Sequence, residues 1–370
     1  MIMLLAMKRV LLIADSNMSL SGVPVVFMSI VRHLHKEYLF DIIVLKDNDM
    51  YFEKEFLSYG GKVFRFNYDK PESFFPKLKW LMSRYPKNVK KFLNENFVLS
   101  DYCAIHSFHE GFSYPFLKEA KKAGVQKRIV HICSAKSAYP LEKNFSQSMF
   151  NWYQKKAFKC CTNIAFVSQK SLELNDYKNK GVVVYNIYDE NKFGHIIDCN
   201  HNNLVLTQIG TFSSRKNQLF SLEVLKLIKK EAPSVKLNIV GKELEQGYLD
   251  KMNGFINDNN LEDNVCFCDG FIDRVDLNKD TSYAIYPSTM ESFGLVLIES
   301  QACGIHCFAN KGIPNDANMG NVDFIELDAK LWAESILQYF NKNRNKRKEP
   351  VNKGRFSTDQ FIKTLNLLYK

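Results

Sequence analysis

The stretch Tyr283-Ala-Ile-Tyr-Pro-Ser-Thr-Met-Glu-Ser-Phe-Gly-Leu-Val-Leu-Ile-Glu299 decides the fold class. Its apolar start, Tyr283–Tyr286, predicts a short buried strand, and Pro287-Ser288 predicts a turn after it. Gly294 then precedes an apolar stretch, Leu295–Ala302, that opens a helix. Strand, loop and helix in this order are one repeat of a parallel α/β sheet. The N–H groups and the dipole at the start of such a helix favour an anion, and a diphosphate is well suited to it.

The same strand and helix pattern repeats along the chain in two series, separated by the polar stretch Asp189–Asn203. We therefore predict two Rossmann-like, doubly wound α/β domains, whose ligand crevice lies at the carboxyl ends of the strands. The predicted bounds are 1–188, 189–350, and a terminal helix in 351–370 that crosses back to the first domain. The predicted strands are Val10–Ala14, Phe40–Leu45, Lys62–Phe66, Tyr102–His106, Arg128–Cys133, Asn163–Val167 and Val182–Tyr185, then Leu204–Ile209, Val235–Val240, Val265–Cys268, Tyr283–Tyr286, His306–Ala309 and Phe324–Leu327.

Composition narrows the function classes. Apolar residues make up 46% of the 370 residues, and 29 Phe and 17 Tyr supply core material, which excludes a disordered chain. The net charge of +10 favours an anionic partner, although a basic surface scattered over the protein is the alternative. No apolar run approaches the roughly 18 residues of a membrane span. Met1–Met7 precedes Lys8-Arg9, the reverse of a secretory signal, so we expect a cytoplasmic protein.

The nine cysteines are an odd number, and several lie in apolar runs, so we expect free thiols. Cys266 and Cys268, with Cys303 and Cys307, raise the alternative of a zinc site. No second C-x-x-C pair exists, and strand alternation predicts that Cys266 and Cys268 face a core. The sequence therefore favours a protein without a bound metal.

Two segments of the second domain carry candidate chemistry. Glu291 lies in the loop before the predicted helix and Glu299 on its second turn, so the two carboxylates can flank a phosphate and accept hydrogen bonds from hydroxyls on either side of it. The alternative is that Glu291 only complements the helix dipole and Glu299 is a surface charge. Gly210 ends a strand and is followed by Arg215 and Lys216 at a helix start, a pattern that also suits phosphate. Two solvated cations are the simpler interpretation.

The first domain gives weaker signals. Gly22 lies in a Ser-rich loop after the first strand, but the dinucleotide fingerprint G-x-G-x-x-G is absent. His106 ends one predicted strand and His131 lies in the next, so both are candidates for the crevice. Satisfied core histidines are the alternative.

Taken together, these segments resemble the retaining glycosyltransferases of family four, which have the GT-B fold of two domains facing across a cleft; the likeness is strongest to the bacterial capsule and exopolysaccharide branch. The resemblance covers almost the whole chain. Its main motif is Glu291, seven residues and Glu299, continuing to Gly304. Its other landmarks are Tyr286-Pro-Ser288, Val240-Gly241, Val184-Tyr-Asn186, and Lys121-Lys-Ala-Gly124 leading to Arg128–His131.

The resemblance implies roles for individual residues. Glu299 would bind the ribose of a nucleotide sugar, Glu291 would contact donor-sugar hydroxyls, and Lys216 would bind phosphate. Gly210, Arg215, Phe293 and the amides of Gly294, Leu295 and Val296 would complete the donor site. His131 would face the donor sugar, and Gly22 and His106 would lie on the acceptor side. This chain has Thr211 where the family usually has Arg, and Cys133 where many relatives have a second His; Arg215 is the substitute we expect at the phosphate.

The predicted function is therefore retaining, metal-independent transfer of a hexosyl residue from a nucleoside-diphosphate sugar to a lipid-linked glycan, without a cofactor. We expect attachment to an anionic membrane at its inner face, through Lys77-Leu-Lys79, Lys87, Lys90-Lys91, Lys121-Lys122, Lys155-Lys156 and the Arg344–Lys348 run. The alternatives are a sugar-nucleotide epimerase of the same fold, a non-catalytic polyanion binder and, because of Thr211, an inactive subunit of a transferase pair. The acidic pair in the predicted crevice and the absence of a basic-aromatic stripe argue against a nucleic-acid partner.

Overall fold

The computed structural model describes residues 7–14, 18–19, 22–45, 50–67, 71, 79–133, 145–199, 201–268 and 274–370. The chain divides into two compact units. Unit 1 consists of Met1–Asn186 together with Thr358–Lys370, and unit 2 is Ile187–Ser357. Residues 351–357 thus lie in unit 2, and the chain returns to unit 1 at Thr358.

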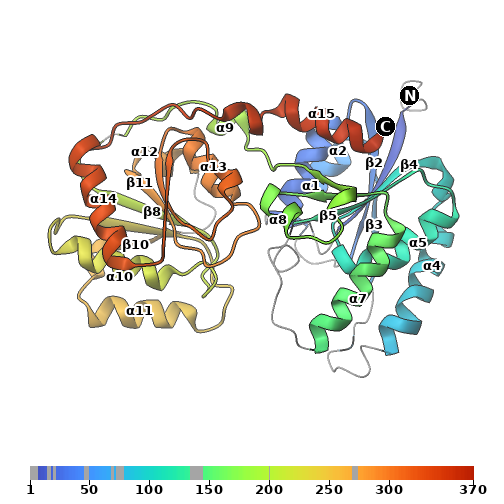
Figure 1. Ribbon diagram of the computed structural model, residues 1–370, viewed down its shortest axis with the longest axis horizontal. Coiled ribbons are helices and arrows are strands. Elements are labelled where there is room, and N and C mark those ends of the chain that lie inside the picture. Colours follow the sequence, from blue (N-terminus) through green and yellow to red (C-terminus); the bar gives the residue numbers. More distant parts are fainter. Residues whose placement is uncertain are drawn as a thin grey trace. The chain divides into compact units, whose positions relative to one another are not determined.

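Unit 1 is a parallel sheet of seven strands in the order β3-β2-β1-β4-β5-β6-β7 (Figure 1). The inner strand β1 is buried on both faces, because Val10, Leu11, Leu12 and Ile13 are all inaccessible to solvent. The strands are β1 (Lys8–Ile13), β2 (Tyr38–Val44), β3 (Val63–Arg65), β4 (Tyr102–Ser107), β5 (Lys127–Ile132), β6 (Asn163–Phe166) and β7 (Gly181–Val183). The helices are α1 (Gly22–Leu34), α2 (Glu53–Ser58), α4 (Tyr85–Asn96), α5 (Tyr114–Lys122), α7 (Phe145–Cys160), α8 (Gln169–Glu173) and α15 (Thr358–Tyr369).

The helix α15 is part of unit 1 although it follows unit 2 in the sequence. The ring of Phe361 on this helix meets the ring of His33 of α1 edge to face, with centroids 6.1 Å apart. Near its end, Tyr369 contacts Tyr38 of β2 in the same manner at 5.3 Å. Phe361, Leu365, Leu368 and Tyr369 are buried, so α15 completes one face of this sheet.

Unit 2 is a parallel sheet of six strands in the order β10-β9-β8-β11-β12-β13 (Figure 1). Its core contains Phe220 of α10 and Trp332 of α14, whose rings meet edge to face with centroids 5.3 Å apart. The strands are β8 (Val205–Ile209), β9 (Lys236–Val240), β10 (Val265–Cys268), β11 (Tyr283–Tyr286), β12 (His306–Asn310) and β13 (Val322–Ile325). The helices are α9 (Glu190–Phe193), α10 (Gln218–Lys229), α11 (Tyr248–Asp258), α12 (Arg274–Lys279), α13 (Leu295–Ala302) and α14 (Ala329–Asn343).

The expectation that Cys266 and Cys268 face a core was wrong. Their strand, β10, is at the edge of the sheet, and Cys266 is exposed while Cys268 is only partly buried. The two Sγ atoms lie 3.8 Å apart, and all nine cysteines are free. No group of three or more His, Cys, Asp or Glu side chains suited to a metal ion occurs among the described residues. Within the same ranges, no helix has the length and apolar character needed to cross a membrane.

Arg347, in the basic run after α14, is not a solvated cation. Its guanidinium donates to four backbone carbonyls of unit 2, those of Ile197 (2.8 Å), Asn278 (2.8 Å), Thr281 (2.7 Å) and Ser282 (3.2 Å). These carbonyls belong to separate segments, so one side chain fastens the run to the linker and to the start of β11.

Candidate functional site

The loop after β8 is held against the neighbouring strand by a close contact between two glycines. The amide of Gly210 donates to Val240 O at 2.9 Å, and a Cβ on Gly241 would lie only 2.1 Å from Gly210 O. A side chain at Gly241 is therefore excluded by the backbone of the loop. The contact fixes where the chain leaves β8.

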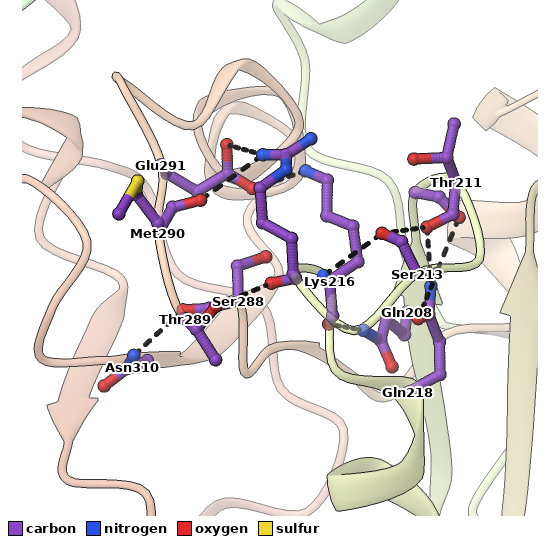
Figure 2. Close-up of polar contacts among 12 residues, drawn as sticks. Gln208, Thr211, Ser213, Lys216, Gln218, Ser288, Thr289, Met290, Glu291 and Asn310 are labelled. Carbon is purple, nitrogen blue, oxygen red and sulfur yellow. Dashed lines mark hydrogen bonds and ion pairs between the residues drawn. The ribbon is translucent and has the colours of Figure 1, made fainter. Parts of the chain in front are cut away.

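Buried side chains then hold the loop in shape (Figure 2). Gln208 donates to Lys216 O at 2.7 Å and accepts from Ser221 Oγ of α10 at 2.7 Å. Gln218, the first residue of α10, donates to Thr211 O at 3.1 Å. A Cβ on Gly210 would lie 3.2 Å from Lys216 Cδ, so the missing side chain gives the lysine stem its path. Lys216 is thus a positioned cation rather than a mobile surface lysine.

Lys216 forms an ion pair with Glu291, through Nζ and Oε1 (Figure 2). Arg215 approaches the other carboxylate oxygen at 3.5 Å and donates to Met290 O at 3.3 Å. The two loops are also joined by their backbones, because Thr289 N donates to Arg215 O at 2.9 Å. The Lys216 and Glu291 side chains are 19% and 12% exposed, so the pair is largely shielded yet open to a ligand.

Helix α13 starts at Leu295, four residues after Glu291. Gly294 takes a φ of +107°, a left-handed conformation that favours glycine, and it caps the helix without a side chain. Leu297 N and Ile298 N both donate to Gly294 O, at 3.0 and 3.2 Å. The amides of Leu295 and Val296 precede these bonds, so they have no intrahelical acceptor. They offer free N–H groups and the positive end of the helix dipole at the end of the loop that carries Glu291.

Glu299, on the second turn of α13, is paired with Arg274 at the start of α12. The pKa of Glu299 is raised to about 7, mainly because the carboxylate is buried; Arg274 and Lys192 oppose this rise, and Asp189 adds to it. The guanidinium of Arg274 also lies over the ring of Phe193, 5.7 Å from its centroid. Arg274 contacts Oε2 of Glu299, and in the described part of the chain no hydrogen bond reaches Oε1. One carboxylate oxygen is therefore left to accept a hydrogen bond from a ligand.

The sequence predicts that the carboxylates of Glu291 and Glu299 flank a phosphate. In the structure each has its own cation, and the residues that pair with them lie far away in the sequence. Lys216 and Arg215 were predicted at the site, but Arg274 was missed; its position at the start of a short helix carried no sequence signal. Phe293 is buried and packs on Phe356 with centroids 5.7 Å apart, so its ring does not line the site. Thr211, two residues after the end of β8, is exposed.

The candidates in unit 1 lie at two places. Gly22 is the first residue of α1, is exposed, and has space for a Cβ, so no steric requirement for glycine is visible there. His106 and His131 are fully buried on β4 and β5 and are hydrogen-bonded to each other at 3.1 Å. Most of the Ser-rich loop before Gly22 lies outside the described residues.

Residues 190–355 match the family described as glycosyl transferases group 1. Unit 2 belongs to this family. The matched range spans β8 to β13 and includes every unit 2 residue of the site, and the chain is therefore a glycosyltransferase.

Relatives and solved structures extend the likeness over both units. The chain is 24% identical to a putative glycosyltransferase, EpsF, of Bacillus subtilis (strain 168), over 92% of this chain and 90% of that protein. It is 23% identical to the capsular polysaccharide biosynthesis glycosyltransferase CapH of Staphylococcus aureus, over 60% of this chain and 64% of that one. The structure of Alr3699/HepE of Anabaena in complex with UDP matches with a TM-score of 0.78 at 17% identity, over 98% of this chain and 99% of that one. The glycosyltransferase thus has the two α/β units of the GT-B fold.

Proposed function

We propose that this glycosyltransferase transfers a hexosyl residue, with retention of configuration, from a nucleoside-diphosphate sugar to a lipid-linked glycan in the synthesis of a cell-surface polysaccharide. The observation that carries the proposal is that Lys216 and Arg215 pair with one carboxylate, Glu291, in the loop that leads to the free N–H groups of Leu295 and Val296 at the start of α13. This set combines the positive charge that a diphosphate needs with an acceptor for sugar hydroxyls.

The proposed donor fits the charges of unit 2. The diphosphate replaces Glu291 as the partner of Lys216, and the amides of α13 donate to its oxygens. Glu291 is then free to accept hydrogen bonds from the sugar, and Oε1 of Glu299 accepts from the ribose. Support by analogy comes from Alr3699/HepE of Anabaena, which was also determined in complex with UDP-glucose and matches with a TM-score of 0.76 at 17% identity.

The proposed chemistry needs charge stabilisation at the leaving group. As the glycosidic bond breaks, negative charge grows on the diphosphate while the sugar carbon becomes oxocarbenium-like. Lys216, Arg215 and the helix N-terminus oppose that charge, so we propose that transfer needs no metal. Retention of configuration rests on the family resemblance. The acceptor is proposed to bind unit 1, and the name of CapH is the basis for proposing a polysaccharide product.

A thermal-shift screen of nucleotide sugars tests the donor. A ligand at 100 times its dissociation constant stabilises a protein by about 2.7 kcal/mol, so the donor should stand out from free sugars and nucleosides. Free nucleoside diphosphate should then appear only when an acceptor is present, which separates transfer from epimerisation. A screen without any stabilising nucleotide sugar, or epimerised donor without acceptor, would overturn the proposal.

The metal-free mechanism has its own test. Activity measured after treatment with EDTA should equal that of the untreated enzyme. Activity that is lost in EDTA and returns only with added magnesium or manganese would contradict it.

A further inference from the structure

Three side chains of unit 1 form a continuous hydrogen-bonded chain that leads from the last turn of α15 into the sheet. Tyr369 Oη lies 2.7 Å from Nδ1 of His106, and Nε2 of His106 lies 3.1 Å from Nδ1 of His131. All three residues are buried. The chain ends at Nε2 of His131, a buried atom without a hydrogen-bond partner in the structure's described ranges.

The geometry of the two imidazoles is that of an in-plane hydrogen bond. The rings are parallel to within 3°, and their nitrogens are 3.1 Å apart while their centroids are 5.2 Å apart, so they meet edge to edge. Phe108 lies over both rings, with centroids 4.7 Å from His106 and 5.0 Å from His131. This cover and the loss of solvent lower the pKa of both histidines, that of His131 to about 3. Both rings are therefore neutral, and each carries one N–H.

The direction of the chain follows from Tyr369. A phenol has one O–H to donate, and burial raises the pKa of Tyr369 well above its usual value, so that proton stays. The described residues offer that O–H a single hydrogen-bond partner, Nδ1 of His106. When Tyr369 donates, Nδ1 of His106 is the bare nitrogen and Nε2 carries the proton. His106 then donates to Nδ1 of His131, which places the proton of His131 on Nε2.

We propose that Tyr369 and His106 are positioning residues that fix His131 as a neutral hydrogen-bond donor at Nε2, directed to an acceptor oxygen of the sugar substrate. The inference rests on the proposed function for the identity of that substrate, but the tautomer itself does not. In this arrangement His131 cannot act as a general base through Nε2, because that nitrogen is protonated and its partner nitrogen is occupied by His106. Its part in the reaction is to bind and orient the substrate.

The tautomers can be measured directly on the full chain by long-range ¹H–¹⁵N correlation spectra of protein labelled at its eight histidines. The signals of His106 and His131 are assigned by their loss in His106→Gln and His131→Gln. At neutral pH we expect both rings to carry the proton on Nε2. A proton on Nδ1 of His131 in the unaltered protein would overturn the inference.

Tyr369→Phe tests the role of the tyrosine, since it removes one oxygen and keeps the ring. Without the O–H of Tyr369, the two directions of the hydrogen bond between His106 and His131 become similar in energy. The form of His131 that carries its proton on Nδ1 should therefore appear in the spectrum. With the donor found in the thermal-shift screen, kcat/KM should fall about twofold if the two forms are equally populated, and more if the second dominates. The matched control is Tyr38→Phe, which removes a hydroxyl that bonds to Asn366 of the same helix at 3.1 Å.

The expected outcome is a mixed tautomer and a lower kcat/KM in Tyr369→Phe, with neither change in Tyr38→Phe. An unchanged His131 spectrum in a folded Tyr369→Phe protein would refute the role of the tyrosine. If the tautomers are as expected but no nucleotide sugar is turned over, the proposed function fails. The tautomers assigned to His106 and His131 then still stand.

Discussion

Lys216 and Arg215 are neighbours, yet they hold Glu291 in different ways. The Lys216 side chain is 19% exposed and lies along Gly210, whereas that of Arg215 is 43% exposed and 3.5 Å from the carboxylate. A shielded charge interacts more strongly with an anion than a solvated one does. Lys216→Gln should therefore weaken donor binding by about 1.5–3 kcal/mol, or about ten- to a hundredfold, and Arg215→Gln by only a few-fold.

Isothermal titration calorimetry with the identified donor measures this difference. Circular dichroism serves as the control for folding, because Lys216→Gln leaves Glu291 without its nearest cation. Equal losses in the two variants would show that Arg215 contributes as much positive charge at the phosphate as Lys216 does. Arg215 would then take the place of the family's arginine, which is Thr211 in this chain.

The buried carboxylate of Glu299 makes donor binding depend on pH. Its pKa is raised to about 7, so the carboxylate is ionised above this pH and protonated below it. Only the ionised form accepts hydrogen bonds from two ribose hydroxyls. Donor affinity should rise between pH 6 and pH 7.5 and level off above, with a limiting slope of about tenfold per pH unit on the acid side.

Calorimetry with a nucleotide sugar, whose diphosphate does not titrate in this range, isolates that effect. Glu299→Gln should bind more weakly at pH 8 and give a flat pH profile. A pH-dependent profile that persists in Glu299→Gln would assign the titration to another group.

At the scale of the elements, one side chain, Arg347, holds the basic run after α14 in place. Arg347 donates to four carbonyls in two separate segments, the linker and residues 278–282, so Arg347→Ala leaves several acceptors without their charged donor. We expect a loss of about 3 kcal/mol, which for a unit of this size lowers the Tm by about 6–12 °C. Differential scanning fluorimetry measures the change. Lys346→Ala is the matched control. Lys346 is the exposed neighbour of Arg347, so its replacement should shift the Tm by no more than about 2 °C.

The bounds of the strands and helices show how far the sequence predicts the fold. Apolar runs located the strands of both sheets, and Val265–Cys268, Tyr283–Tyr286 and Leu295–Ala302 have their predicted bounds. At the sheet edge, the run Phe324–Leu327 was displaced by two residues from the observed β13, Val322–Ile325, because an edge strand buries few side chains and has a weak pattern. The faces of the β10 cysteines were wrong for the same reason.

The candidate site was predictable only in part. Local patterns identified Lys216, Glu291 and Glu299, because each lies in a strand–loop–helix segment with its own signature. The pairing of Glu299 with Arg274 and the bonds of Arg347 join segments that are distant in sequence, and no spacing rule brings them together. The hydrogen-bonded chain from Tyr369 to His131 depends on the return of α15 to unit 1. This return brings together Tyr369 and His106, which are more than 200 positions apart in the sequence.

At the scale of the whole molecule, the charge of +10 bears on membrane attachment. Of the cationic clusters named from the sequence, Lys87 and Lys90 lie exposed on α4, and Lys91 beside them forms an exposed ion pair with Glu95 at 3.8 Å. Lys122 is paired with Glu119, Arg347 is bound to carbonyls, and Lys77 lies outside the described residues. We expect the protein to bind vesicles containing anionic lipid at low salt, at about 1 kcal/mol per well-placed cation. Binding should weaken with salt, since the Debye length falls from about 10 Å at 0.1 M to 3 Å at 1 M.

Co-sedimentation with anionic and neutral vesicles provides the measurement. Replacing Lys87 and Lys90 by Gln should lower the affinity by about 2 kcal/mol, or about thirtyfold, whereas the exposed unit 2 pair Lys226 and Lys230 is the control. Absence of binding at low salt would refute the expectation. Binding that persists at 1 M salt would indicate insertion of apolar side chains instead.

The return of α15 to unit 1 has a consequence for synthesis on the ribosome. Domains generally fold as they emerge, the N-terminal one first, at about 5–20 residues per second. Here the helix that covers β2 and reaches His106 is translated only after every residue of unit 2. The nascent first unit must therefore wait, with part of its apolar surface uncovered, until the second unit has been made. This order predicts that a released chain truncated after Ser357 engages chaperones through unit 1, while its unit 2 is already protected from protease.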